Sequence, residues 1–256
     1  MRQGSRVLLV AAAILAAPLV LHAQYAMDMK LDNTSYLQFE SMEARVVVRN
    51  DTDRMLLVGG LRETASIDFI INRGNEPVRR RSAGLIVENT LIMPGQTREV
   101  VVDLGRHYNI QTIGQYEITA TFTADRGTYK SAPTIVDVVP GLELTNVRRS
   151  VPNHPSMIRK YSLRYWSRQN REMLFLCVTD EKEGINYGVF MLGPIVRVIP
   201  PEISVDSSGE VRVRHQADNG VFAHTALKST AEGVALVRQQ IKTEDVRLPG
   251  GGKPAK

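Results

Sequence analysis

The sequence predicts an all-β protein with two β domains behind an N-terminal export signal. Between residues 24 and 140, short segments of alternating apolar and polar residues are separated by clusters of Gly, Pro, Asn and Asp, a pattern typical of strands and turns. From residue 202 onward, three turn dipeptides ending in glycine stand 11 and 13 residues apart, with alternating segments between them. These patterns predict a β-sandwich over residues 24–140 and a smaller antiparallel β-meander domain over residues 141–246.

Residues 1–23 have the three-part order of a secretory signal peptide. Arg2 and Arg6 precede an uncharged run, and Ala23 follows as a small residue suited to cleavage. A helix over this fifteen-residue run rises about 22 Å, short of the roughly 30 Å hydrocarbon core, which favours cleavage over an uncleaved membrane anchor. Residues 247–256 are predicted to form a disordered tail. We expect an exported protein, periplasmic or extracellular, with no membrane span after cleavage.

Seven strands are expected in the first domain. In chain order they are Met27–Leu31, Ala44–Arg49, Ser66–Ile71, a weak strand at Leu85–Val87, Thr97–Leu104, Gln115–Phe122 and Thr134–Val139. Turn-forming clusters at residues 50–53, 72–77 and 94–95 separate several of them. About seven short strands in about 115 residues are the signature of a β-sandwich.

One short motif sharpens this prediction. Gly114–Tyr116 opens the most regular strand, after a long connection. It resembles the corner of immunoglobulin-like sandwiches, where a tyrosine at the start of strand F hydrogen-bonds back to the preceding corner. The family has Asp where this chain has Thr112, and Cys where it has Ile118, so the disulfide of antibody domains is absent. Residues 36–139 are similar to the disulfide-free immunoglobulin-like domains of exported bacterial proteins, which implies a fold and at most a binding role.

The second domain is predicted to consist of hairpins. Gln169–Asn170 joins two alternating segments into a hairpin, and a polar loop is expected at residues 152–155. The Asn219–Gly220 turn is the strongest hairpin signal in the chain. Residues 203–213 resemble a strand-turn-strand unit of a β-propeller blade, but a propeller needs at least about four blades, more than this half could supply.

Candidate chemistry is sparse, and we expect no catalytic residue, no cofactor and no metal site. The sequence lacks the spacings of nucleophile elbows, zinc-binding helices, phosphate loops and EF-hands. Cys177, the single cysteine, is expected to be a buried thiol in an apolar strand. The acidic pairs Asp180–Glu181 and Glu244–Asp245 are interpreted as solvated charge, because neighbouring strand residues point to opposite faces. Arg79–Arg81 is interpreted as a solvated loop rather than a patch for an acidic partner.

Two histidines give the only geometric signal. If Asn219–Gly220 is a two-residue turn, Asp218 lies opposite Val221 and His215 lies opposite His224. Directly opposed residues have Cβ atoms about 4.5–5.5 Å apart, close enough for two imidazoles to share a metal. Zinc needs three or four ligands, and no acidic residue of this hairpin completes the set. We therefore expect a cross-strand packing pair.

Charge excludes one class of partner. Residues 141–256 carry 17 Lys+Arg against 12 Asp+Glu without a basic stripe interleaved with aromatic residues, so no nucleic-acid partner is expected. The remaining features favour a non-enzymatic exported binding or structural protein with a protein or envelope polysaccharide as its partner. An accessory module of an envelope hydrolase and a secreted protease inhibitor that presents residues 71–82 are the alternatives. Pilus chaperones also have two β domains, but a long connection and a meander depart from their two equivalent sandwiches.

Overall fold

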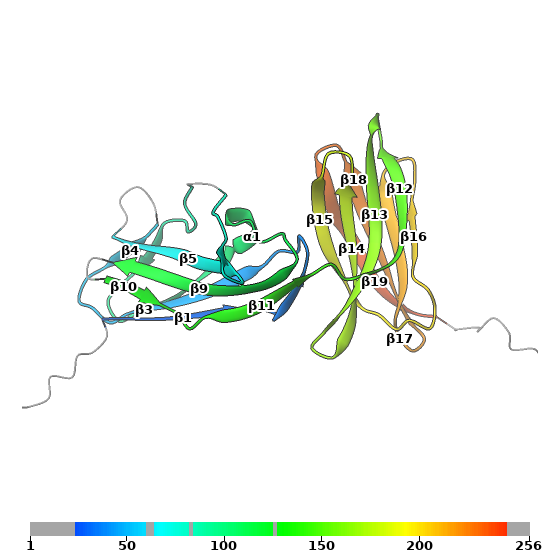
Figure 1. Cartoon of the computed structure of the whole chain (residues 1–256). Coiled ribbons are helices and arrows are strands. Elements are labelled where there is room, and N and C mark those ends of the chain that lie inside the picture. Colours follow the sequence, from blue (N-terminus) through cyan, green and yellow to red (C-terminus); the bar gives the residue numbers. More distant parts are fainter. Residues whose placement is uncertain (1–23, 60–63, 82–83, 125–126, 245–256) are drawn as a thin grey trace, which may run out of the picture.

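The computed structural model describes residues 24–59, 64–81, 84–124 and 127–244. The predicted signal peptide (1–23) and the predicted tail (247–256) lie outside these residues. The described residues form nineteen strands and a single short helix, so the prediction of an all-β protein is confirmed. Figure 1 shows two elongated β bodies set at a steep angle to each other, which we call the first half and the second half.

The first half is a sandwich of two sheets. One sheet has the order β1 (Tyr25–Leu31), β3 (Glu43–Asn50), β8 (Thr97–Asp103) and is antiparallel. The other has the order β2 (Ser35–Leu37), β11 (Thr134–Val139), β9 (Gly114–Ala124), β5 (Ala65–Arg73), β4 (Leu56–Val58), β7 (Thr90–Ile92), with β6 (Glu76–Pro77) paired to β5 and β10 (Gly127–Lys130) paired to β9. Helix α1 (Leu104–His107) follows β8.

Alternation along the strands builds the core between these sheets. The even-numbered residues of β3 from Ala44 to Val48 are fully buried, and so are the alternate residues of β9 from Tyr116 to Phe122. They belong to one apolar cluster to which both sheets contribute. Each large apolar side chain buried in this way contributes about 1.5–3 kcal/mol. The strand predicted at Gln115–Phe122 is therefore confirmed, with one face in the core.

The predicted tie from Tyr116 to the preceding corner is present. Its hydroxyl donates to the backbone carbonyl of Thr112 at 2.6 Å, and the ring is 1% exposed. The long connection before β9 begins with α1, where the Asp103 side chain caps the helix by accepting from the Gly105 amide at 3.0 Å. Leu104, predicted as the end of a strand, instead begins this helix.

The strand predicted at Leu85–Val87 is wrong. The structure has no strand over these residues, and the strand of this region is β7, which pairs with β4. Val87 is buried, but Leu85 is exposed, so the segment contributes one core residue without pairing. The short strands β2, β4, β6 and β10 were not predicted, because two to four residues are too few to establish alternation.

The second half consists of two four-stranded antiparallel meanders packed face to face. The first sheet runs β12 (Leu142–Val151), β13 (His154–Arg168), β14 (Arg171–Asp180), β15 (Ile185–Pro194). The second runs β16 (Glu202–Val205), β17 (Glu210–Asp218), β18 (Val221–Thr230), β19 (Gly233–Thr243). Residues of both sheets share one apolar cluster. The predicted β-meander corresponds to the second sheet, and the hairpin predicted around Gln169–Asn170 belongs to the first.

Turn chemistry explains the connections in the first sheet. Gln169 and Asn170 both have positive φ, 50° and 61°, as a tight hairpin turn requires, so the predicted hairpin is present. The polar loop predicted at residues 152–155 is shorter in the structure: Pro152 and Asn153 form the turn of a hairpin, and His154 and Pro155 already belong to β13. Asn153 has a φ of 63°, a conformation that asparagine tolerates better than most residues.

A buried arginine connects the two sheets of the second half. Arg159 on β13 is fully buried and donates to Ser229 Oγ at 2.7 Å and to the carbonyls of Ala231 and Gly233 at 3.2 Å. Its guanidinium lies 3.6 Å from the centroid of the Tyr187 ring. These contacts hold the turn between β18 and β19, and so fix where β19 begins.

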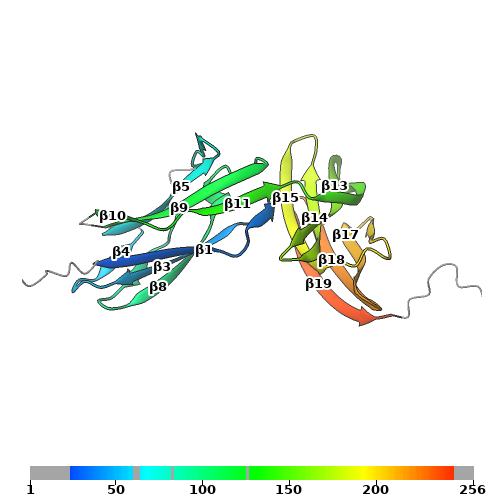
Figure 2. The same cartoon turned by 60° about the horizontal axis from the view of Figure 1, so that its bottom comes forward.

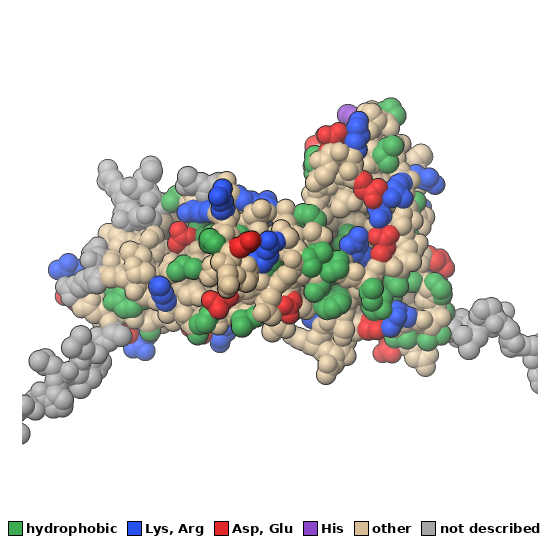
Figure 3. Space-filling view, viewed as in Figure 1, with side chains coloured by type: hydrophobic (Ala, Val, Ile, Leu, Met, Phe, Trp, Pro, Cys, Tyr) green, Lys and Arg blue, Asp and Glu red, His purple; other side chains and the backbone are tan. Residues whose placement is uncertain are grey.

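The two halves meet in a packed junction. Leu37 of β2 packs with Phe175 and Cys177 of β14, which lie on the face of β14 opposite to the core of the second half. Arg168 forms two hydrogen bonds with the Glu40 carboxylate, at 2.7 and 3.0 Å. β14 is thus buried on both faces, which explains its continuous apolar run. Figure 2 shows β11 entering the junction beside β15, and apolar side chains gather there on the surface in Figure 3.

Candidate binding surface on the β16–β19 sheet

The predicted pairing of His215 with His224 is wrong. The turn closes as predicted, with Asp218 opposite Val221, but a β-bulge between Gln216 and Asp218 shifts the register by one residue. His215 therefore lies opposite Ala223 and His224 lies opposite Arg214. Because side chains alternate between the faces of a sheet, the two imidazoles are on opposite faces.

His215 faces the interior. It is 1% exposed, and its Nε2 lies 3.1 Å from the Pro194 carbonyl. A carbonyl can only accept, so Nε2 carries the proton. Burial lowers the pKa of His215 to about 4, with a smaller contribution from His224, which keeps the ring neutral near pH 7. The role of His215 is structural.

His224 belongs to a charged network on the outer face. Its Nε2 lies 2.6 Å from one oxygen of Glu244, and Arg214 lies 2.6 Å from the other. Arg214, with His224 as the second cause, holds the pKa of Glu244 below its usual range. Arg214 also lies 3.5 Å from Glu202, and its guanidinium is 4.0 Å from the centroid of the Phe222 ring. Arg214 is therefore fixed by one aromatic and two acidic neighbours.

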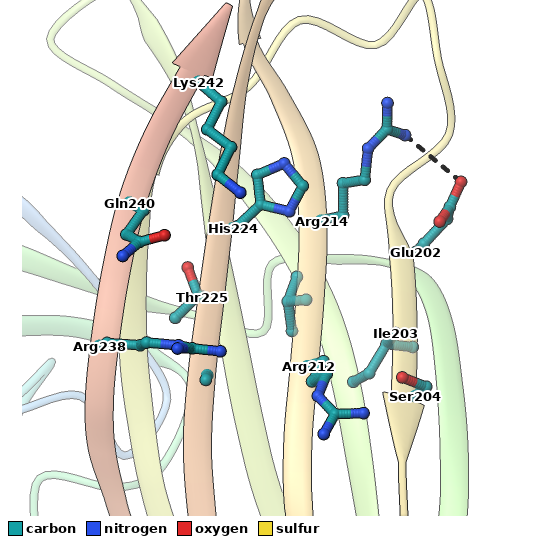
Figure 4. Close-up of a pocket in the computed structure, with 12 residues that line it drawn as sticks. Glu202, Ile203, Ser204, Arg212, Arg214, His224, Thr225, Arg238, Gln240 and Lys242 are labelled. Carbon is teal, nitrogen blue, oxygen red and sulfur yellow. Dashed lines mark hydrogen bonds and ion pairs between the residues drawn. The ribbon is translucent and has the colours of Figure 1, made fainter. Parts of the chain in front are cut away.

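This network forms one side of a hollow of about 410 Å³ over the outer face of the second sheet. All four strands line it, β19 through Arg238, Gln240 and Lys242. Figure 4 shows the Lys242 side chain extending toward the His224 ring, with Arg238 farther along the same strand. We call this hollow the basic groove; its cationic residues are Arg212, Arg214, Arg238 and Lys242, and the His224 ring lies among them.

The cations of the basic groove are not equally neutralised. Arg212 lies 3.0 Å from Glu210 and 3.3 Å from Asp206, so its charge is balanced. Arg238 and Lys242 make no ion pair with any residue that the structure describes. The positive charges of these two side chains, both on β19, are therefore not neutralised by any described residue.

The other residues singled out from the sequence have structural environments. Cys177 is buried as predicted, and burial raises the pKa of its thiol to about 11, which makes it unreactive. Asp180, predicted to be solvated, is 4% exposed and accepts from the amides of Lys182 and Glu183 in the turn after β14. Glu181 does pair with Arg148 at the surface, at 3.0 Å.

The arginine cluster is tied to the body of the first half. The Arg81 amide donates to the His107 carbonyl at 2.7 Å, and the Asn109 amide donates to the Arg79 carbonyl at 3.3 Å. The backbone of Arg80 forms an isolated antiparallel β-bridge with Tyr108, and its guanidinium lies 3.6 Å from the Asp68 carboxylate. In the protease-inhibitor alternative, residues 71–82 would face the protease. Residues 79–81 of that segment are held against residues 107–109.

Within the described ranges, no group of three or more His, Cys, Asp or Glu residues could hold a metal ion. No helix in the part of the chain that the structure describes is long and apolar enough to cross a membrane. Comparison with protein-family models gives no match, and comparison with curated proteins finds none with recognisable similarity. The basic groove was not predicted. Its residues come from four strands, and the bulge in β17 decides whether Arg212 and Arg214 point to the outer face or to the core.

Proposed function

We propose that this chain is a non-enzymatic exported binding protein and that the basic groove holds an anionic partner. The observation that carries the proposal is the placement of Arg238 and Lys242 along a hollow, without an ion pair to any described residue. Complementary charge of this kind steers an anionic partner and orients it. Export is proposed from the signal-like order of residues 1–23.

The first half serves in this proposal as a rigid scaffold of immunoglobulin-like type. Two facing sheets with a shared core and the bond from Tyr116 to the Thr112 carbonyl support that resemblance. The packed junction supports a fixed orientation of the groove relative to the first half, because Leu37 and the ion pair between Glu40 and Arg168 connect them.

Calorimetric titration with polyglutamate and with polygalacturonate at low salt tests the groove. Arg238→Gln combined with Lys242→Gln should weaken binding at least about tenfold, because each hydrogen bond to a charged group contributes about 1.5 kcal/mol and 1.4 kcal/mol is a factor of ten. The matched control, Lys30→Gln with Arg98→Gln, removes the same charge from exposed positions on β1 and β8.

Equal weakening by both double variants would show that only net charge matters and would overturn the groove as a site. Absence of binding to both polymers would overturn the proposed function. Clear preference for polygalacturonate would favour the alternative of an accessory module that acts on acidic envelope polysaccharide.

A further inference from the structure

β19 is the edge strand of the second sheet, and it is unusually open. It pairs with β18 alone, and among the described residues no backbone group bonds to its other edge. Every residue from Ala235 to Thr243 is exposed, including Leu236 (53%), Val237 (62%) and Ile241 (63%). Long edge strands with exposed apolar residues are templates for pairing with another chain.

The hydrogen-bond pattern shows which backbone groups are open. The Glu244 amide donates to the Gly220 carbonyl at 2.9 Å, in register with the opposition of Thr243 to Val221. In an antiparallel pair, hydrogen-bonded and non-hydrogen-bonded positions alternate. The backbone N–H and C=O groups of Lys242 and Gln240 therefore bond to β18. Those of Gln239, Ile241 and Thr243 point away from β18, toward the open edge.

The side chains along this edge are sorted by face. Arg238, Gln240 and Lys242 line the basic groove. Ile241 lies opposite Ala223 and so faces the other side of the sheet. If a strand were added to this edge, every second side chain of it would lie beside Arg238 and Lys242. The side chains between them would lie on the other face, beside Ile241.

We propose that the outer edge of β19, residues 238–243, binds an extended segment of a partner protein in which acidic and apolar residues alternate. The segment adds a fifth strand to the four-stranded sheet. Main-chain hydrogen bonds to Gln239, Ile241 and Thr243 hold it, and its acidic side chains meet Arg238 and Lys242. This inference rests on the proposed function, because it uses the same groove and names the partner class.

A second copy of this chain is a poor occupant. In an antiparallel β19–β19 pair centred on Gln240, Arg238 of each copy would lie opposite Lys242 of the other. Like charges directly opposite on a sheet are destabilising. In this register, the cations that attract an acidic strand therefore also oppose self-pairing.

The test is a fluorescence-anisotropy titration of the intact chain with short blocked peptides. A peptide in which glutamate and valine alternate should bind, and one in which lysine and valine alternate should not. N-methylation of the glutamate–valine peptide at the nitrogens that would face β19 keeps every side chain but removes the donors. It should bind at least about tenfold more weakly, because strand addition depends on main-chain hydrogen bonds.

Charge exchange supplies the second arm. Arg238→Glu with Lys242→Glu should reverse the preference to the lysine–valine peptide, whereas Lys30→Glu with Arg98→Glu should leave it unchanged. Equal binding of the methylated and unmethylated peptides would overturn strand addition but leave an anion-binding groove in place. Failure of both the glutamate–valine peptide and polyglutamate to bind would overturn the groove as well. Dimerisation of the chain with loss of peptide binding would overturn the choice of partner.

Discussion

Replacing Glu40 by leucine leaves the guanidinium of Arg168 without its carboxylate at the junction. The two side chains are only 13% and 10% exposed, and they are joined by hydrogen bonds of 3.0 and 2.7 Å. Breaking a buried pair by removing one partner costs about 3–5 kcal/mol. Because some exposure remains, we expect about 3 kcal/mol, the lower end of that range, for Glu40→Leu and for Arg168→Met. The double variant should cost no more than Glu40→Leu alone, since both lose the bond from the Leu37 amide to Glu40 at 2.8 Å, which gives a coupling free energy of about 3 kcal/mol.

Urea unfolding followed by tryptophan fluorescence measures these losses. Trp166 is the single tryptophan and lies at the junction, where its Nε1 donates to Ser35 Oγ at 3.1 Å. Glu99→Leu is the matched control, because its pair with Arg45 is 50% and 40% exposed and exposed pairs contribute about 0–1 kcal/mol. Losses for the junction variants no larger than for Glu99→Leu would refute the argument that the pair holds the halves together.

Two further predictions concern single buried groups. Tyr116→Phe should lower the free energy of unfolding by about 1 kcal/mol, the usual contribution of one hydrogen bond, and Tyr116→Ala by about 3–5 kcal/mol through lost packing; denaturant unfolding in which the phenylalanine variant loses nothing would contradict the bond to Thr112. The pKa of His215 is lowered in the folded state to about 4, so its stabilising contribution is complete above about pH 6.5 and is lost as the pH falls toward 4. Unfolding free energies measured across this interval should fall less steeply for His215→Gln than for the wild type, and identical slopes would contradict the prediction.

The sequence predicted the elements that are long and regular. Alternation located β3, β5 and β9, because each has one face in the core and one outside it. Turn dipeptides located the β16–β19 meander, because glycine at Gly209 and Gly220 has a positive φ that other residues rarely adopt. Of the first sheet of the second half, only the β13–β14 hairpin was predicted; its pairing into a four-stranded sheet was not, since β14 is buried on both faces and gives a continuous apolar run without alternation.

The basic groove could not be predicted from the sequence for a different reason, which is the bulge in β17. Without the bulge in β17, Arg212 and Arg214 would lie opposite Leu227 and Thr225 and would face the core, while Val211 and Val213 would face solvent. The bulge reverses this assignment, so that the valines are buried and the arginines line the groove. β18 contains apolar residues on both faces, and its pattern alone does not select between the two registers.

The contacts that order β19 determine how readily its free edge can bind another strand. Its start is fixed by the bonds from the buried Arg159 to the turn before it, and its inner edge pairs with β18 from Gly233 to Thr243, with one bulge at Val237. The strand is therefore ordered before any partner arrives, which lowers the entropic cost of adding another strand. An ordered apolar edge is also an aggregation hazard. In the register centred on Gln240, Arg238 and Lys242 oppose pairing between copies, so the same two charges that define the proposed partner also disfavour that pairing when the partner is absent.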